Sequence, residues 1–587
     1  MKFSAAVSGL LWTALATAAP RVDDDNGVSY VGTVTKDTES FLNIRYGQDT
    51  GNENRFKRPQ PYSYAPDTVV DATAPGAACP QKLGNPIPQF TGLFGNTTRI
   101  SEDCLTLRVD RPVDTPANAQ MPVLVHLHGG GYAFGSAYDD TAYPPAGLVR
   151  ENDFKDLPAI YVAINYRLGA FGFAASDALR EEDNLNVGLL DQRLGLQWVQ
   201  DHIEAFGGNK HNVTIFGSNV GFSNVQFQLT AYGRSDDAGL FSGAILSSGP
   251  TLAGDAVTAG LSDQHTASLA ESLDCASEDS AAELACLRST PLDTIVDAAV
   301  NVSLEVMPLG GMGAFRPTAP SSFIPDAPSR LLRDGRFNYN VNIIAGWNED
   351  EGTQWVPATL NSTAGFVATL HALFPGLSPV NLGQLPILYP LSEFHDFPSE
   401  NIERNYFRAA RAVRDAQFVC PAVRVGEAWE RYASDQHALF IYSLNQTVFR
   451  VGDAHVGRSH VGVDHFSDIP YLFDYIDNAE FSQVADQSDY DIASHLTGSW
   501  SAFARFGQPS VPGLSDDQLV RWNLTFPDWV PARQEDFAGW RIRVLGGPRD
   551  GRATILWGDE GEGVYDESIA ERCRFWGRPD VLLEMGN

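Results

Sequence analysis

Near residue 219 a short apolar strand leads, through a turn flanked by glycines, directly into a helix. Residues 213–216 have the apolar, mostly β-branched character of a buried strand, and Gly217-Ser218-Asn219-Val220-Gly221 follow them. This is the G-x-S-x-G pattern of a nucleophile elbow, whose central residue has positive φ and presents its side chain to a pocket. Here that residue is Asn219. Asparagine tolerates positive φ, so the turn is expected to form, but an amide nitrogen is not a usable nucleophile.

Further short apolar runs recur along the chain, separated by helical or glycine- and proline-rich stretches. Runs this continuous are typical of strands in a mostly parallel sheet that is buried on both faces. The expected fold is α/β, with a large, mostly parallel central sheet flanked by helices. Residues 191–206 are predicted to be helical, and residues 252–329 and 363–415 to form helical caps over the carboxyl edge of the sheet. The predicted strands are 122–128, 159–166, 213–217, 244–248, 341–347 and 438–444.

The N-terminus has the pattern of a secretory signal peptide, predicted to span residues 1–18. Lys2 precedes an uncharged apolar stretch that reaches Leu15, and small residues follow at 16–18. This stretch is too short to span a bilayer, and no later segment is long and apolar enough to act as a transmembrane anchor. We therefore expect a secreted protein. No linker or internal repeat divides residues 19–587, so they are predicted to form a single domain.

Cysteine content and charge agree with an extracellular location. The six cysteines are an even number, as disulfide pairing in an oxidising compartment requires. A net charge of -32 argues against a nucleic-acid partner, because phosphate binding needs a basic surface. Possible glycosylation sites begin at Asn96, Asn212, Asn301, Asn361, Asn445 and Asn523. The cysteines are Cys79, Cys104, Cys275, Cys286, Cys420 and Cys573.

Three other segments supply groups that would work with an elbow of this kind. A glycine triplet at 129–131 follows a predicted strand, and its backbone N–H groups, with that of Val220, could form an oxyanion hole; the alternative is an ordinary glycine turn. Glu351 follows another strand and is the candidate acid, and His465 lies on a later loop as the candidate base. Alone, such residues are usually a solvated acid and a structural histidine. Their order after position 219 favours the catalytic interpretation.

These segments together resemble the type-B carboxylesterase/lipase family, which includes cholinesterases and fungal lipases of the α/β-hydrolase fold. The resemblance runs from about Tyr30 to Trp576, nearly the whole mature chain. Besides the elbow and the Glu351 and His465 loops, it rests on Asn165-Tyr166-Arg167-Leu168-Gly169, Asn186-Val187-Gly188-Leu189-Leu190-Asp191-Gln192 and Ala205-Phe206-Gly207-Gly208-Asn209.

The resemblance implies specific roles and pairings. Glu351 and His465 would be triad members with position 219, and Gly130, Gly131 and Val220 would be the oxyanion donors. The disulfides would be Cys79–Cys104, Cys275–Cys286 and Cys420–Cys573. No cofactor or metal is expected. The chain departs from the family at Asn219, and also at Ser218, where the family usually has glutamate.

Neither neighbouring serine is a good substitute nucleophile. Using Ser218 would shift the turn by one residue and place Phe216 and Val220 at the small flanking positions. Ser223 lies a turn into the following helix, too far to reach both His465 and the oxyanion hole. Without the nucleophile, the expected site is a largely apolar pocket. Asn219, His465, Glu351 and several inward N–H donors would lie at its base.

The leading hypothesis is a secreted, non-hydrolytic esterase homologue that binds a hydrophobic, phenolic or polyketide small molecule. The fungal secreted branch of the family includes proteins without the nucleophile that act as dirigent partners, as in viriditoxin-type biosynthesis. Such proteins hold phenolic monomers while a laccase-type multicopper oxidase makes radicals, and so direct the regiochemistry and handedness of coupling. Two alternatives stay open. One is an active carboxylesterase or lipase, or an engineered Ser→Asn variant of one; the other is an extracellular interaction protein.

Overall fold

The structure is a computed structural model. The predicted signal peptide and the sequons at Asn96 and Asn523 lie outside the residues that it describes. The described residues are 19–35, 37–84, 95, 97–149, 157–235, 238–249, 260–306, 313–434, 436–478, 481–510, 541–547, 553–555 and 568–585.

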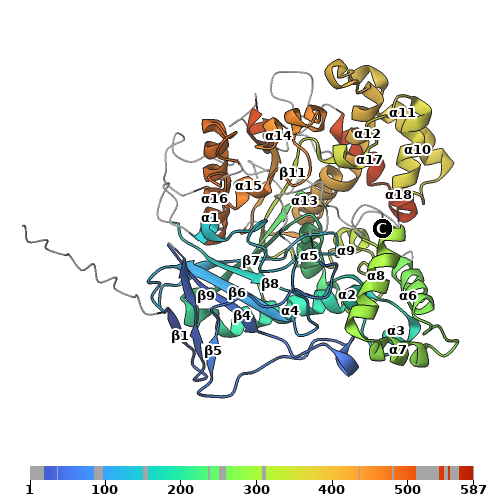
Figure 1. The fold of residues 1–587 in the computed structure, drawn as a ribbon. Coiled ribbons are helices and arrows are strands. Elements are labelled where there is room, and N and C mark those ends of the chain that lie inside the picture. The colour runs from blue at the N-terminus through green and yellow to red at the C-terminus, as the bar shows by residue number, and fades with distance from the viewer. Residues whose placement is uncertain are drawn as a thin grey trace, which may run out of the picture.

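A large sheet forms the centre of the molecule (Figure 1). The strands are β1 (Arg21–Asp23), β2 (Ser29–Val31), β3 (Thr33–Thr35), β4 (Thr38–Arg45), β5 (Val69–Asp71), β6 (Thr106–Pro112), β7 (Met121–His126), β8 (Ile160–Ile164), β9 (Gly208–Ser218), β10 (Gly243–Ser247), β11 (Asn342–Asn348), β12 (Leu439–Leu444), β13 (Arg541–Leu545) and β14 (Ala553–Ile555). Among the described residues the main sheet has 11 strands in the order β14-β13-β12-β11-β10-β9-β7-β8-β6-β4-β3. Neighbours from β13 to β8 are parallel, and the pairs at both edges are antiparallel. The predicted α/β architecture with a mostly parallel sheet is confirmed.

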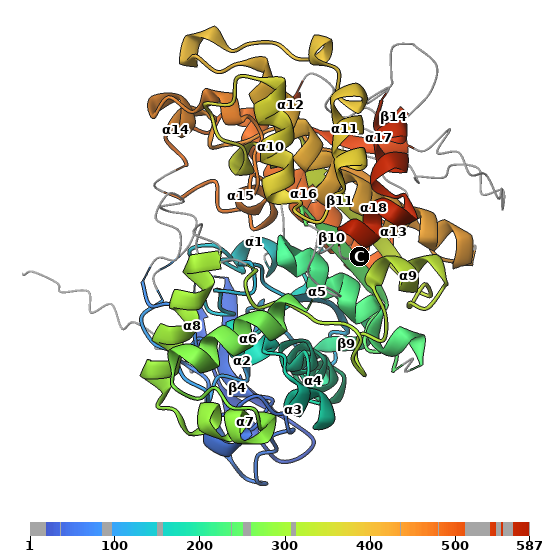
Figure 2. The same ribbon diagram turned by 90° about the vertical axis from the view of Figure 1, so that its right-hand side faces the viewer.

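Helices cover both faces of this sheet and extend beyond it. They are α1 (Ala146–Val149), α2 (Gly169–Phe173), α3 (Asp177–Glu181), α4 (Val187–His202), α5 (Val220–Leu229), α6 (Leu261–Ser272), α7 (Ser280–Ser289), α8 (Leu292–Val306), α9 (Pro328–Arg333), α10 (Thr363–Leu373), α11 (Pro379–Leu388), α12 (Arg404–Arg414), α13 (Cys420–Tyr432), α14 (Arg450–His455), α15 (Ile469–Leu472), α16 (Gln487–Phe506), α17 (Ile569–Trp576) and α18 (Pro579–Glu584). The helix predicted at 191–206 corresponds to α4 and the short 3-10 turn after it. The two regions predicted as caps contain α6–α8 and α10–α12, which lie toward the viewer in Figure 2.

The continuous apolar strands are explained by packing on both faces. In β7, Val123 and Val125 belong to a buried cluster that includes Leu196 of α4. Leu124, between them, belongs to the cluster that includes Trp500 of α16. Because successive side chains of a strand point to opposite faces, a strand covered on both sides needs apolar residues at every position. All six strands predicted from such runs are present, as β7 to β12.

Three disulfides join the cysteines in the pairs implied by the family resemblance. They are Cys79–Cys104, Cys275–Cys286 and Cys420–Cys573. Of the sequons in the described residues, Asn301 and Asn361 are exposed, and Asn212 and Asn445 are half-buried. Within the described ranges, no helix has the length and apolar character needed to cross a membrane.

Parallel strands end at one edge of the sheet, and the predicted site residues all follow strands that end there. The glycine loop follows β7, Asn219 follows β9, Glu351 follows β11 and His465 lies on the connection after β12. Since β7 and β9 are neighbours and only β10 separates β9 from β11, these connections lie close together. This edge is where open α/β sheets usually place their binding sites.

Candidate functional site

The turn at Asn219 has the backbone geometry expected of a nucleophile elbow. Asn219 has φ 61° and ψ -131° and stands between the end of β9 and the first residue of α5. The turn requires glycines on both sides: an added Cβ would lie 2.6 Å from the carbonyl oxygen of Leu127 at Gly217, and 2.4 Å from it at Gly221. Any larger residue would push the helix away from the strand. The substitution at the central position has therefore left the strained turn intact.

The side chain of Asn219 occupies the predicted oxyanion hole. Its Oδ1 accepts hydrogen bonds from the backbone N–H groups of Gly130 and Gly131, both at 3.1 Å. Its Nδ2 lies 2.8 Å from Nε2 of His465. The orientation of the amide is settled by its partners, since only an oxygen can accept from two backbone N–H groups. The N–H donors expected to face an open pocket are thus already bound, because an asparagine side chain is long enough to reach them.

His465 is held between Asn219 and Glu351. Its Nδ1 lies 2.5 Å from Oε2 of Glu351, and Oε1 of Glu351 accepts the backbone N–H of Asn348 at 2.8 Å. The amide nitrogen of Asn219 can only donate, so Nε2 of His465 is an acceptor and the ring proton is on Nδ1. The three predicted residues therefore form one hydrogen-bonded chain, in which the nitrogen that would act as the base is occupied.

Ser218 and Val220 flank Asn219 without taking over a catalytic role. The Ser218 hydroxyl donates to Oδ2 of Asp468 at 3.2 Å, on a different path from His465. The amide of Val220, predicted as a third oxyanion donor, makes no hydrogen bond to the Asn219 side chain within the described part of the chain. In the described part of the chain, the donors to Oδ1 of Asn219 are the N–H groups of Gly130 and Gly131.

Asp468 is a buried site residue that the sequence did not single out. Its Oδ1 accepts a hydrogen bond from Nδ2 of Asn348 at 3.3 Å, and the residue is 1% exposed. Burial, and then the nearby charge of Glu351, raise the pKa of Asp468 to about 6. Its one sequence signal is its place three residues after His465, on the same loop.

Sequence comparison decides the family of this arrangement. The profile described as "Carboxylesterase family" matches residues 26–534. The chain belongs to the carboxylesterase family. It is 34% identical to the inactive carboxylesterase-like protein VdtD of Byssochlamys spectabilis, over 96% of this chain and 94% of that protein. It is 31% identical to a secreted lipase of Arthroderma benhamiae, over 98% and 97% respectively. It is 30% identical to the cholinesterase of Mus musculus, over 82% and 76%.

Aromatic rings surround His465 in this carboxylesterase homologue. The ring centres of Trp355, Phe418 and Phe466 lie 5.1, 5.3 and 4.2 Å from the imidazole. Phe418 belongs to a π-helical turn, Asp415–Val419, inserted between α12 and α13. Such an insertion changes the direction of the side chains that follow it, and it often marks a functional site. Trp355 is half-buried, whereas Phe418 and Phe466 are buried.

Two clefts adjoin the loop that carries the oxyanion donors. One, of about 40 Å³, lies between α2 and α8 and reaches Ala133; its lining includes Phe171, Val296 and Ala299. The other, of about 580 Å³, has polar and apolar lining in similar amounts and reaches Phe134 and Gly135. The first is apolar but smaller than a typical ligand pocket, so a two-ring ligand would have to move α8 away from α2. Nowhere in the described ranges do three or more His, Cys, Asp or Glu side chains gather as metal ligands would.

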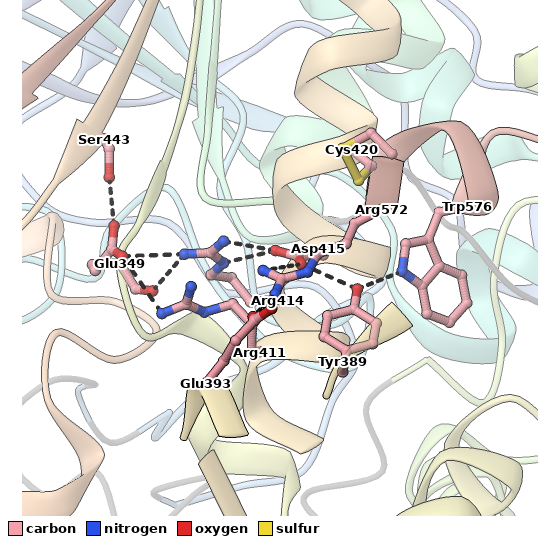
Figure 3. A network of polar contacts seen from close by, with 11 residues as sticks. Glu349, Tyr389, Glu393, Arg411, Arg414, Asp415, Cys420, Ser443, Arg572 and Trp576 are labelled. Atoms are coloured by element: carbon pink, nitrogen blue, oxygen red, sulfur yellow. Dashed lines mark hydrogen bonds and ion pairs between the residues drawn. A yellow bond between two sulfur atoms is a disulfide. The ribbon is translucent and has the colours of Figure 1, made fainter. Parts of the chain in front are cut away.

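A largely buried ionic network contacts the loop that carries Glu351 (Figure 3). Two guanidinium nitrogens of Arg414 contact Oδ1 of Asp415, at 2.9 and 2.7 Å, and a third contacts Oε1 of Glu349 at 3.1 Å. Glu349 also accepts from the Ser443 hydroxyl at 3.2 Å. Because Glu349 is two residues before Glu351, the network fixes the loop that orients the imidazole.

The same network reaches the C-terminal helix α17. Oδ2 of Asp415 accepts from the Tyr389 hydroxyl at 3.1 Å and lies 3.8 Å from a guanidinium nitrogen of Arg572. Trp576 donates from its indole to the Tyr389 hydroxyl at 2.8 Å. The Cys420–Cys573 disulfide, drawn beside these residues in Figure 3, joins α17 to the start of α13. The C-terminal segment thus contributes to the support of the site.

Asp464 gives the loop of His465 a testable pH dependence. Burial raises its pKa to about 7 from an ordinary value near 3.8, although Gln354 donates to its carboxyl at 2.9 Å. Between about pH 4 and pH 7 the unfolded chain therefore releases a proton that the folded chain keeps. The contribution of this group to the free energy of unfolding is therefore largest below this window. It falls as pH rises through the window, and above the window it no longer changes with pH.

We expect Asp464→Asn to remove this part of the pH dependence. In the unmodified protein, Asp464 should lower the free energy of unfolding by about 2–3 kcal/mol between about pH 5 and pH 8. The variant should lose correspondingly less over the same range. Denaturant unfolding of both proteins at the two pH values measures the difference, and parallel losses would show that Asp464 is ionised in the fold.

Proposed function

We propose that this carboxylesterase homologue is a secreted, non-hydrolytic protein that binds a hydrophobic phenolic or polyketide molecule. It holds that molecule while a laccase-type multicopper oxidase oxidises it, and so directs the regiochemistry and handedness of phenol coupling. The observation that carries the proposal is the side chain of Asn219. It satisfies both glycine donors and His465, which keeps the site assembled without a nucleophile.

Hydrolysis is disfavoured on three separate grounds. Position 219 has no nucleophilic atom, the oxyanion donors are occupied, and Nε2 of His465 already accepts a hydrogen bond. Ester hydrolysis needs all three functions together, and loss of the nucleophile alone typically lowers turnover by about a million-fold. The similarity to a relative described as inactive supports the same conclusion, and the similarity to a secreted lipase supports secretion.

Ligand binding is supported by what surrounds the modified site. The aromatic rings of Trp355, Phe418 and Phe466 pack around His465, and a separate apolar cleft between α2 and α8 reaches Ala133, two residues after the donor Gly131. A phenolic ring could pack against such surfaces with its oxygen toward Asn219. Pockets of this composition, apolar with a few polar groups, are typical of small-molecule binding.

The coupling chemistry itself would belong to the oxidase. For each pair of phenols the oxidase removes one electron and one proton from each ring, and two such pairs together reduce one O₂ to two molecules of water. The two phenoxyl radicals then form a carbon–carbon bond, and tautomerisation of each ring restores its phenol. The present protein supplies orientation alone. A preference of about 1.4 kcal/mol between two coupling geometries already gives a tenfold excess of one product.

Coupling in the presence of the protein tests the proposal. A laccase oxidises 2-naphthol, and separately a naphthopyrone monomer, with and without the protein, and the binaphthyl-type products are resolved on a chiral column. We expect an atropisomer excess with at least one monomer when the protein is present, and racemic product without it. Racemic product from both monomers in the presence of folded protein would contradict the proposal.

A matched pair of substitutions localises the effect. Ala299→Trp places a large ring in the cleft between α2 and α8, where Ala299 is 7% exposed. Val380→Trp makes a similar change on α11, where the side chain is 73% exposed. We expect the first variant to lose the atropisomer excess and the second to keep it, with circular dichroism confirming that both are folded. An excess that survives Ala299→Trp would exclude this cleft.

A further inference from the structure

The hydrogen bonds of Asn219 leave one donor of its side chain unused. Oδ1 accepts from both Gly130 and Gly131, so its lone pairs are occupied. Nδ2 carries two hydrogens, and one of them is directed at Nε2 of His465. Among the described residues, Nδ2 makes no second hydrogen bond. Asn219 is 6% exposed, so this donor is largely removed from solvent.

An unused buried donor favours a partner that can accept. Leaving an N–H group buried without an acceptor is costly, and a ligand oxygen that meets it recovers that cost. His465 cannot serve the ligand in the same way, because both of its ring nitrogens are already engaged with Asn219 and Glu351. In a site derived from an esterase, the amide of Asn219 thus becomes the polar group that a ligand can address.

The charges around Asn219 restrict the kind of acceptor. Glu351 is fully buried and is linked to Asn219 through His465, and Asp468 is 1% exposed and bonded to the neighbouring Ser218. In a buried environment, two nearby carboxylates repel an anionic ligand group more strongly than they would in water. A neutral carbonyl oxygen of a ligand can accept a hydrogen bond without this repulsion. A carboxylate of a ligand would be repelled by both side chains.

We propose that Asn219 is a specificity-determining residue that donates its second Nδ2 hydrogen to a neutral carbonyl oxygen of the ligand. The ligand class is therefore an aromatic ketone, ester or lactone, and free acids are excluded. This inference rests on the proposed binding function and narrows it. The carbonyl binds beside Asn219 and outside the oxyanion hole, which explains how an ester or lactone could be held without being hydrolysed.

Three naphthalene probes of similar size test the inference on the full-length protein. They are 2-acetylnaphthalene, which carries a neutral carbonyl, 2-ethylnaphthalene, which carries no acceptor, and 2-naphthoate, which is anionic. We expect the ketone to bind about fivefold more tightly than the hydrocarbon, in keeping with one added hydrogen bond, and the acid to bind most weakly. Titration calorimetry gives the affinities. Infrared spectroscopy of the ¹³C-labelled ketone should show its carbonyl stretch at lower frequency when bound.

Variants assign the effect to the amide. Asn219→Asp keeps the shape of the side chain but replaces the donor by an acceptor, so the preference for the ketone over the hydrocarbon should disappear. Asn401→Asp makes the same change at an exposed position outside the possible glycosylation sites and should keep the preference. The infrared measurement needs no variant, so it tests the inference even if Asn219→Asp folds poorly.

The possible outcomes separate this inference from the proposed function. Equal affinity for ketone and hydrocarbon, with an unshifted carbonyl stretch, would overturn the inference and leave apolar binding intact. Tighter binding of 2-naphthoate would also overturn it, because it would require a cationic site. Failure of all three probes to bind would contradict the proposed function and the inference together.

Discussion

Asn219→Ser is expected to turn this protein into an esterase. A serine side chain is shorter than that of asparagine, so it would release the N–H groups of Gly130 and Gly131 and leave Nε2 of His465 free to accept the hydroxyl proton. Removing the nucleophile of a serine hydrolase costs about a million-fold in turnover, and we expect about a thousand-fold of this to return. Full recovery is not expected, because Ser218 replaces the glutamate usual in the family. Turnover of short p-nitrophenyl esters measures the gain.

Two controls show where the gain comes from. Asn219→Ala opens the oxyanion hole without supplying a nucleophile, so its turnover should stay at the level of the unmodified protein. Adding His465→Gln to Asn219→Ser removes the base and should abolish the gain. A folded Asn219→Ser variant without ester turnover would show that the remaining groups are not arranged for catalysis.

Asp415→Asn is expected to destabilise the fold strongly. Asp415 is fully buried and carries the charge that faces both Arg414 and Arg572, which are each 1% exposed. Removing one partner of a buried ion pair leaves an uncompensated charge and typically costs about 3–5 kcal/mol. Arg414 would keep its contact with Glu349, and Arg572 would keep its contact with Glu393. Denaturant unfolding followed by fluorescence measures the loss.

The same chemical change on the surface is the matched control. Asp396 pairs with Arg404, and the two side chains are 41% and 42% exposed. Surface pairs of this kind contribute little, because water solvates each charge when the other is removed. Asp396→Asn should therefore leave the unfolding midpoint almost unchanged. Equal shifts for the two variants would mean that the network around Asp415 is not the support that its burial indicates.

The central fold could be predicted because its strands are apolar at every position. That pattern follows from burial on both faces, and it located β7 to β12. The outer strands were not predicted, because their residues are not apolar at every position. In β4 and β6, at the antiparallel edge, apolar residues alternate with buried polar ones such as Ser40, Arg108 and Asp110, which satisfy one another by hydrogen bonds. Such pairs are visible only once the strands are side by side.

The site was predictable in its order but not in its internal contacts. The sequence placed Asn219, Glu351 and His465 in one site because α/β sheets bring the ends of parallel strands together. It did not show that the amide of Asn219 would occupy the oxyanion hole, because that depends on the length and direction of one side chain. Phe418 was equally hidden, since a π-helical turn that is absent from the sequence pattern directs it at His465.

The central claim is that the site is assembled but carries no nucleophile, and covalent labelling tests it most directly. The unmodified protein and Asn219→Ser are incubated with a fluorophosphonate that reacts with activated serines, and intact masses are then measured. We predict no adduct on the unmodified protein and one adduct, mapped to residue 219, on the variant. A stoichiometric adduct on the unmodified protein, at Ser218 or any other residue, would contradict the account.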